Sequence, residues 1–216
     1  VWSPRAQIDK RQYEKLVREA VKNSDVDIIV GEVVSVKEVS GRVRSLLLRS
    51  GEEIKTVSAI ITSGTFLSGV MHIGERKINA GRMGEERAEG LTESLHSIGL
   101  RSARLKTGTP PRLEKSSIDW TKTMEVSGDI EPVPFSYSTQ SFEPPNTPCH
   151  TIRTNPGVHE VIFQNQSRSP MFSGDIVGVG PRYCPSIEDK VSRFSDRASH
   201  TLFLEPEWLD SDQIYL

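Results

Sequence analysis

Residues 180–194 read Gly180-Pro181-Arg182-Tyr183-Cys184-Pro185-Ser186-Ile187-Glu188-Asp189-Lys190-Val191-Ser192-Arg193-Phe194. The stretch places a single thiol immediately before an expected helix. Its three apolar residues, Ile187, Val191 and Phe194, recur at i, i+4 and i+7, the spacing of one helix face. Two helix starts are open. Pro185 suits a first helical position, whereas Ser186 and Asp189 can form a capping-box-like pair.

Cys184 has two interpretations. At a helix N-terminus, unpaired N–H groups and the helix dipole stabilise a thiolate, and Arg182 or Lys190 would add to that effect. Alternatively, Cys184 is a small, half-buried core residue, which is the commoner role of a lone cysteine. The local sequence does not choose between them.

Composition excludes several classes of protein. The 216 residues include 27 Lys+Arg and 29 Asp+Glu, and the net charge of −2 argues against bulk non-specific nucleic-acid binding. There is no apolar run of about 18 residues, the length of a membrane span. The two cysteines, Cys149 and Cys184, are too few for a disulfide framework and lack metal-ligand spacing, so we expect a reducing compartment. The chain starts at Val1 without Met, and we expect it to be part of a longer protein.

The first 65 residues predict an α/β arrangement. Asp9 is expected to cap a helix that runs to about Lys22. Four strands are expected at 27–30, 33–39, 43–48 and 54–57, with a turn at Ser40-Gly41. A continuous apolar run at 59–62 predicts a buried parallel strand that ends in Ser63-Gly64-Thr65. Ligands of open α/β sheets lie beyond such strand ends, so Gly64 and Thr65 are candidate contacts; an ordinary loop glycine is the alternative.

Four cations lie within twelve residues of the middle of the chain. These residues are Arg101, Arg104, Lys106 and Arg112. They follow a glycine-rich loop expected at 69–84 and a helix expected at 85–98, which Gly99 ends. A strand at 100–106 would put Arg104 and Lys106 on one face, before a stiff turn at 107–112. The cluster is either a solvated face or a surface that contacts nucleic-acid phosphates.

The last third predicts mixed structure. We expect irregular chain at 127–148, an extended segment at 148–153, a helix from Asn155-Pro156 to about Asn165, and a strand at 200–204 that Glu205-Pro206-Glu207 ends. His150 and His159 are expected to be surface or capping residues, since no partner stands at metal-ligand spacing. Cys149 belongs to no motif, and we expect it to be structural.

Blocks along the whole chain resemble one family. They are Arg5-Ala6-Gln7-Ile8-Asp9-Lys10, Gly64-Thr65-Phe66-Leu67, His72-Ile73-Gly74, Gly81-Arg82-Met83-Gly84-Glu85, residues 104–112, Ser169-Pro170-Met171-Phe172, residues 180–194 and Phe203-Leu204-Glu205-Pro206-Glu207. The chain is similar to the MnmG/GidA family, the FAD-dependent large subunit of the enzyme that makes 5-carboxymethylaminomethyl uridine at tRNA position 34.

The resemblance implies a glutathione-reductase-like FAD/NAD(P)-binding α/β fold. Residues 1–99 would be the central part of an incomplete flavin domain, and residues 100–216 an inserted, nicotinamide-domain-like NADH- and substrate-binding domain. The glycine fingerprint for the FAD pyrophosphate is expected before Val1, and further flavin-domain and C-terminal helical segments beyond Leu216. This chain alone is therefore expected not to retain FAD tightly and to be inactive.

The resemblance also implies an activity. A cytoplasmic homodimer with FAD and NADH, working with the GTPase MnmE, would add an aminomethyl or carboxymethylaminomethyl group to C5 of uridine-34, with methylene-tetrahydrofolate as the carbon donor. Two alternatives remain: an NAD(P)H-dependent flavoprotein oxidoreductase acting on a small molecule, and a non-catalytic fragment that binds nucleotide or tRNA.

Individual roles carry over by position. Val33 falls where the family contacts FAD from its adenine-side strand, and Ala88 where some members have a flavin-contacting serine. Residues 180–194 match the segment assigned to nicotinamide-nucleotide binding, and Cys184 matches one of two mechanistic cysteines. Glu188 or Asp189 would act as acid or base, or simply cap the helix, while Arg182, Lys190 and Arg193 would hold a nucleotide phosphate or tRNA backbone.

Overall fold

The computed structural model describes residues 5–174, 176, 178 and 185–216, which form two compact units. Unit 1 comprises Val1–Val26, Thr107–Phe163 and Pro185–Leu216, and unit 2 comprises Asp27–Lys106 and Gln164–Cys184. Each unit is therefore assembled from separate stretches of chain rather than divided by one cut. The assignment of residues 1–99 to a flavin domain and 100–216 to a nicotinamide domain stays a prediction.

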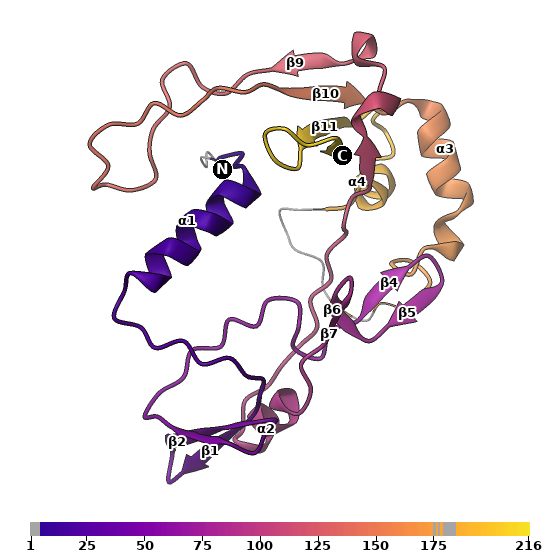
Figure 1. The fold of residues 1–216 in the computed structure, drawn as a ribbon. Coiled ribbons are helices and arrows are strands. Elements are labelled where there is room, and N and C mark those ends of the chain that lie inside the picture. The colour runs from indigo at the N-terminus through magenta and orange to yellow at the C-terminus, as the bar shows by residue number, and fades with distance from the viewer. Residues whose placement is uncertain (1–4, 175, 177, 179–184) are drawn as a thin grey trace. The chain divides into compact units, whose positions relative to one another are not determined.

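Unit 1 is built on a five-stranded antiparallel sheet of order β8-β12-β11-β10-β9, of which β9, β10 and β11 are labelled in Figure 1. Its strands are β8 (Arg112–Glu114), β9 (Met124–Val126), β10 (Cys149–Arg153), β11 (Thr201–Pro206) and β12 (Gln213–Tyr215). Short 3₁₀ turns, Lys115–Ser117 and Trp120–Lys122, join β8 to β9. Leu204 and Ile214 are buried within this sheet, and Val191 of a nearby helix is fully buried.

The described part of unit 1 contains the α-helices α1, α3 and α4, and a side-chain cap starts each of them. Helix α1 (Lys10–Lys22) begins at Asp9, whose carboxylate accepts hydrogen bonds from the N–H groups of Arg11 and Gln12. Helix α3 (Pro156–Gln164) begins where Asn155 accepts from Val158 N at 3.1 Å. The sequence predicted both starts, and both are confirmed.

Helix α4 (Ile187–Arg193) decides between the two predicted starts of the 180–194 stretch. Ser186 is the N-cap, and its hydroxyl accepts from Asp189 N at 3.2 Å. The capping alternative is confirmed, and the placement of Pro185 at the first helical position is wrong. A hydroxyl that satisfies an unpaired N–H stabilises the helix start, which proline cannot do.

Unit 2 contains a three-stranded meander of β1 (Val33–Val39), β2 (Arg42–Leu48) and β3 (Glu53–Lys55). The predicted turn at Ser40-Gly41 is confirmed, and both residues have positive φ, 53° and 77°. Positive φ at both central positions matches a right-twisted two-residue hairpin. Helix α2 (Leu91–Ser97) packs against β1, and Gly99 (φ 88°) follows its end as predicted. A 3₁₀ turn at Gln166–Arg168 also belongs to this unit.

Two predicted buried strands, at 27–30 and 59–62, are wrong. Neither segment forms a strand, and Val30 and Ile60 are 95% and 91% exposed. A strand requires neighbours for its backbone groups, and no strand among the described residues pairs with either segment. An apolar run alone does not supply those neighbours.

Other corrections concern turns and strand ends. The expected loop at 69–84 forms strands: β4 (Met71–Ile73) pairs with β5 (Arg76–Ile78), and β6 (Ala80–Arg82) with β7 (Glu85–Glu86). Because β7 takes Glu85 and Glu86, the predicted helix at 85–98 shortens to α2. Residues 100–106 form no strand beyond an isolated bridge at Leu105.

The sequence predicted that Glu205-Pro206-Glu207 ends the last strand, and this prediction is wrong because the chain stays in the sheet there. Strand β11 includes Pro206, which lies opposite Ile214. Proline has no N–H to donate, and the next residue supplies one instead, because Glu207 N donates to Gln213 O at 3.1 Å.

Candidate functional site

The predicted site residues fall into both units. Residues 180–184, including Cys184, lie outside the described residues. Residues 185–194 belong to unit 1, whereas Val33, Gly64, Thr65 and Ala88 belong to unit 2. Two separate surfaces must therefore be considered.

The residues expected to contact FAD lie at one corner of unit 2. Ala88 bridges Leu67, with its N–H donating to Phe66 O at 2.9 Å and its carbonyl accepting from Ser68 N at 3.0 Å. The turn at Gly64 is confirmed, since Phe66 N donates to Ser63 O and Gly64 has φ 56°. The structure thus brings Ala88 beside the 63–68 turn. The N–H of Ala88 is already used, so only its carbonyl retains a free lone pair for a ligand.

Close glycine packing holds this corner together. A Cβ on Gly81 would lie 2.3 Å from the ring of Phe66, so only glycine fits there. The adjoining hydroxyl of Thr65 donates to Gly81 O at 2.6 Å. Gly90 (φ 89°) approaches β1, where a Cβ would lie 3.1 Å from Val34 O. The corner therefore offers a ligand backbone groups rather than free hydroxyls.

Glu32, which sequence reasoning missed, anchors the start of β1. Its carboxylate accepts from Arg49 Nε at 2.5 Å and Nη2 at 2.7 Å, and from Glu89 N at 3.2 Å. The Arg49 hydrogen bonds lower the pKa of Glu32 to about 2. Glu32, which precedes Val33, is thus bonded to Glu89, which follows Ala88. It links the chain next to two of the predicted FAD contacts, Val33 and Ala88. Its signal in the sequence is weak, because both partners are distant along the chain.

The described part of the 180–194 segment is firmly packed in unit 1. Val191 is fully buried, while Phe194 remains partly exposed. A Cβ on Gly108 would lie 3.4 Å from Ser186 Cβ, which places the 107–111 turn against the helix cap. Asp189 pairs with Arg193 at 3.7 Å and contributes its N–H to the cap, as a structural residue would.

The four cations of the basic cluster are not alike. Arg101, Arg104 and Lys106 belong to unit 2, and Arg104 Nη2 donates to Ser68 O at 2.8 Å. Arg112 belongs to unit 1, where its Nε pairs with Glu207 and its guanidinium lies 4.8 Å from the Tyr215 ring centroid. The structure therefore separates Arg112 from the other three.

A pair of buried carboxylates, Glu205 and Glu207, was also missed. They are 5% and 9% exposed. Arg5 Nη2 donates to both oxygens of Glu205 at 2.7 and 2.9 Å, and Lys10 and Arg112 both bond to Glu207. Burial alone would raise the pKa of Glu207, but its hydrogen bonds from Lys10 and Arg112 prevail and lower it. We call these five residues the carboxylate network.

The start of α1 extends the carboxylate network. Asp9 accepts from Leu209 N at 2.9 Å, and this bond, together with the cap of α1, lowers the pKa of Asp9. Lys10 Nζ and Arg11 Cζ lie 5.0 and 3.7 Å from the Trp208 ring centroid. These contacts fix the N-terminal end of α1 to the loop between β11 and β12.

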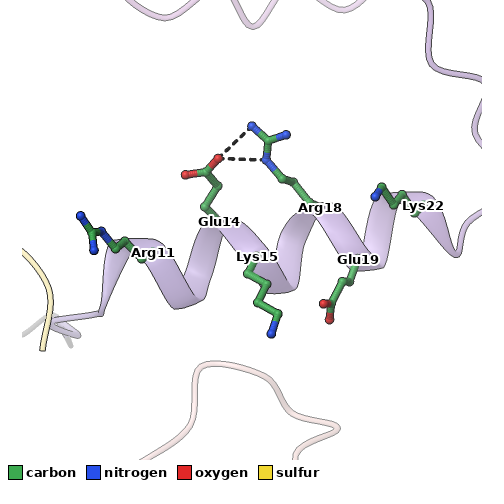
Figure 2. A pocket seen from close by; sticks show the side chains of 6 residues that line it. All are labelled: Arg11, Glu14, Lys15, Arg18, Glu19 and Lys22. Carbon is green, nitrogen blue, oxygen red and sulfur yellow. Dashed lines mark hydrogen bonds and ion pairs between the residues drawn. The ribbon is translucent and has the colours of Figure 1, made fainter.

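Two surface depressions lack the features of a reaction site. One follows the polar face of α1, where all six side chains come from one helix and Glu14 pairs with Arg18 at 2.8 Å (Figure 2). The other, of about 440 Å³, lies over β9 and β10 between residues 121–124 and 151–153. Neither brings together groups from distant elements that would act on a substrate.

The histidines and Cys149 have structural surroundings. His150 Nδ1 lies 2.9 Å from Thr123 Oγ1, and the His150 ring packs on Trp120. His159 is buried, so the prediction that it is a surface residue is wrong. Burial raises the pKa of the Cys149 thiol. Across the described ranges, no three His, Cys, Asp or Glu side chains are placed to hold a metal, and no helix is long and apolar enough to span a membrane.

All of residues 1–216 match the family described as glucose inhibited division protein A. The chain belongs to this family. It is 46% identical to a Chlorobaculum tepidum protein over 99% of the chain and 44% identical to a Thermodesulfovibrio yellowstonii protein over 100% of it. Both are named tRNA uridine 5-carboxymethylaminomethyl modification enzyme MnmG, and the chain spans 35% of each, about a third of their length.

Solved structures show the same fold. Aquifex aeolicus GidA in one crystal form superposes with a TM-score of 0.88 at 40% identity, over 99% of this chain and 37% of that one. A second crystal form gives a TM-score of 0.85 at 38% identity. The predicted family and its α/β fold are therefore confirmed.

Proposed function

We propose that the intact protein modifies C5 of wobble uridine-34 in tRNA, adding a carboxymethylaminomethyl or aminomethyl group. The observation that carries this proposal is the match of the whole chain to a family whose relatives, 46% and 44% identical, bear that activity in their names. FAD, NADH, methylene-tetrahydrofolate, the GTPase MnmE, a homodimeric state and a cytoplasmic location complete the proposal by the same resemblance.

Cys184 is the proposed catalytic group. C5 of uracil is a poor nucleophile until a group adds at C6, and a cysteine thiolate is suited to that addition or to carrying an activated methylene. Ser186, two residues further along the chain, is the N-cap of α4, and a helix start favours an anionic group close to it, which supports this role.

The proposed FAD contacts are Val33, Gly64, Thr65 and Ala88. Their backbone groups would contact the nucleotide, since Gly64 has open space around it and the Ala88 carbonyl retains a lone pair. When bound, the flavin would supply hydride equivalents derived from NADH. Residues 180–194 are proposed for the nicotinamide nucleotide, with Lys190 and Arg193 as the described cations suited to its phosphates.

Arg101, Arg104 and Lys106 are the proposed tRNA contacts. All three lie in unit 2 and none is paired with a carboxylate in the structure as described. The pairing of Arg112 with Glu207 favours a structural role for that residue over direct RNA contact.

A chimera tests the proposed function. Residues 1–216 would replace the matching third of the Chlorobaculum tepidum protein, and modified uridine-34 would be measured by mass spectrometry of tRNA from a host that lacks the enzyme. We expect modification with the chimera, none with its Cys184→Ser variant, and full modification with the matched Cys149→Ser control.

The results separate the alternatives. Normal modification by the Cys184→Ser chimera would refute catalysis by that thiol. An active flavoprotein that oxidises NADH equally with and without tRNA, and leaves uridine-34 unmodified, would favour a small-molecule oxidoreductase. A flavin absorbance band that co-purifies with the 216-residue chain would contradict the expectation that it cannot retain FAD alone.

A further inference from the structure

A cluster of three buried polar side chains lies in unit 1, apart from every residue discussed so far as a ligand contact. Thr154 follows β10, His159 belongs to α3, and His200 precedes β11; they are 5%, 8% and 7% exposed. Figure 1 shows β10, β11, α3 and α4 gathered in this part of the unit. Two buried imidazoles in contact need an explanation, because protonation of either places a charge in the interior.

Thr154 is the hub of this cluster. Its N–H donates to His200 O at 2.9 Å, and its Oγ1 accepts from His200 N at 2.8 Å. The same Oγ1 lies 2.8 Å from His159 Nε2. These three bonds join α3 to the point where β10 and β11 meet.

The Thr154 hydroxyl has only one proton, so the direction of its hydrogen bond to His159 depends on whether His159 Nε2 carries a proton. When His159 Nε2 carries no proton, the hydroxyl donates to it and every group is satisfied. When Nε2 is protonated, the hydroxyl must accept from it and turn its own proton to His200 O, 3.4 Å away. The 2.8 Å bond to His159 therefore persists in either state with its direction reversed, so Thr154 itself does not oppose protonation of His159.

The surroundings of His200, by contrast, oppose its protonation. Its Nε2 is buried without a hydrogen-bond partner, so an added proton there would have no acceptor. Its ring lies 5.4 Å from that of His159, close enough for two charges to repel. Around it, Lys190 of α4 and Arg197 add positive charge, and Asp196 adds one negative charge. Burial, and then His159, lower the pKa of His200.

We propose that Thr154, His159 and His200 form a proton-operated latch, which joins α3 to the β10–β11 junction while His200 is neutral and opens when His200 gains a proton. The sign follows from the lowered pKa of His200: the stabilisation is complete above the ordinary histidine pKa of about 6.5 and is lost as pH falls through the lower folded value. Lys190 of α4 is one of the charges that act on His200, so the same proton also influences α4, the described part of the 180–194 segment.

Side-chain ¹⁵N NMR of the 216-residue chain tests the latch. His159→Gln and His200→Gln variants assign the two imidazoles, and the exposed His96→Gln is the matched control. We expect His200 to be mainly neutral at pH 6.5 and to titrate below that value. Titration of His200 at or above pH 6.5 in the wild-type chain would overturn the proposal, even if a variant failed to fold.

Amide exchange reports the opening itself. After correction for the intrinsic pH dependence, we expect exchange in α3 to rise several-fold between pH 7.5 and 5.5, and by at most about tenfold, which is the limit for one displaced proton equilibrium. His200→Gln should abolish most of this rise, and His96→Gln should leave it unchanged. An equal rise in His200→Gln and wild type would show that the histidine pair does not operate α3.

Discussion

Arg112 and the stretch 101–106 carry the same kind of charge in different settings. Arg112 reaches a carboxylate that is 9% exposed and shares it with Lys10. Arg101, Arg104 and Lys106 have no carboxylate partner among the described residues. The contrast teaches that a run of cations in a sequence is not one functional unit, because a partner almost a hundred residues away changes the role of one member.

Removal of Glu207 should break the carboxylate network most severely. Glu207→Gln leaves Lys10 and Arg112 without their shared anion, and we expect the free energy of unfolding to fall by about 3 kcal/mol, since two hydrogen bonds to a charged group are lost. Urea denaturation at pH 7 measures it. The matched control, Glu131→Gln on the exposed 127–148 segment, should change stability by less than about 0.5 kcal/mol; equal effects of the two changes would contradict the network.

Arg112→Gln should lower the free energy of unfolding by less than Glu207→Gln does, because Lys10 still pairs with Glu207. We expect a loss of roughly 2 kcal/mol, the range of a hydrogen bond to a charged group. Arg101→Gln is the control at the other end of the basic cluster, with an expected change within about 0.5 kcal/mol. If the two arginines cost the same in denaturation, the distinction between paired and unpaired cations fails.

Asp9→Ala tests how α1 is attached to the network. It removes the N-cap of α1 and the acceptor for Leu209 N, and caps are worth about 1 kcal/mol. We expect a loss of about 1–2 kcal/mol and faster amide exchange in the first turn of α1. Unchanged exchange there would show that Lys10 and Arg11 hold the helix without the cap.

Acid should reveal the paired carboxylate of unit 2. The folded pKa of Glu32 is about 2, below its ordinary value of 4.5. A depressed carboxylate stabilises the fold above the unfolded pKa and loses that contribution as pH falls through the folded one, here between about 4.5 and 2. Glu32→Gln should therefore flatten the stability–pH curve in this window, and the exposed Glu52→Gln should not.

The smallest effect on stability, with the clearest effect on RNA, is expected from the unpaired cations. Arg101→Gln, Arg104→Gln and Lys106→Gln together should change the free energy of unfolding by less than about 1 kcal/mol. They should reduce the salt dependence of tRNA binding by the intact enzyme, by about 0.7–0.9 in slope per lost phosphate contact. An unchanged slope would remove these residues from the RNA surface.

Local signals in the sequence predicted the elements that local bonds define. The turn at Ser40-Gly41, the cap at Asp9 and the cap at Ser186 all act within four residues, and all three are confirmed. The segments 27–30 and 59–62 failed because strand formation depends on a neighbour that an apolar run does not reveal. The prediction that the strand ends at Glu205-Pro206-Glu207 failed for the same reason. The carbonyl of Gln213, which lies further along the chain, accepts the next hydrogen bond from Glu207 N and continues the strand.

The residues of the candidate site were harder to predict from the sequence than the elements of the fold. The corner of Ala88 and the 63–68 turn was predicted only through family resemblance, and the structure adds that they touch. Glu32, Glu205 and Glu207 escaped because their partners lie 17 to 200 residues away along the chain. Acidic residues are common, and a single sequence does not mark which of them will be buried.

The order of strands in unit 1 constrains how the chain is made. Strand β12 (Gln213–Tyr215) lies between β8 and β11, so β8 has no neighbour in the sheet until residues 213–215 have left the ribosome. Most of unit 2 is complete by residue 106 and is inserted between parts of unit 1. During synthesis, the exposed edges of β8 and β11 must therefore wait for β12, and a ribosome that stalls before residues 213–215 are made would hold two open strand edges available for mispairing.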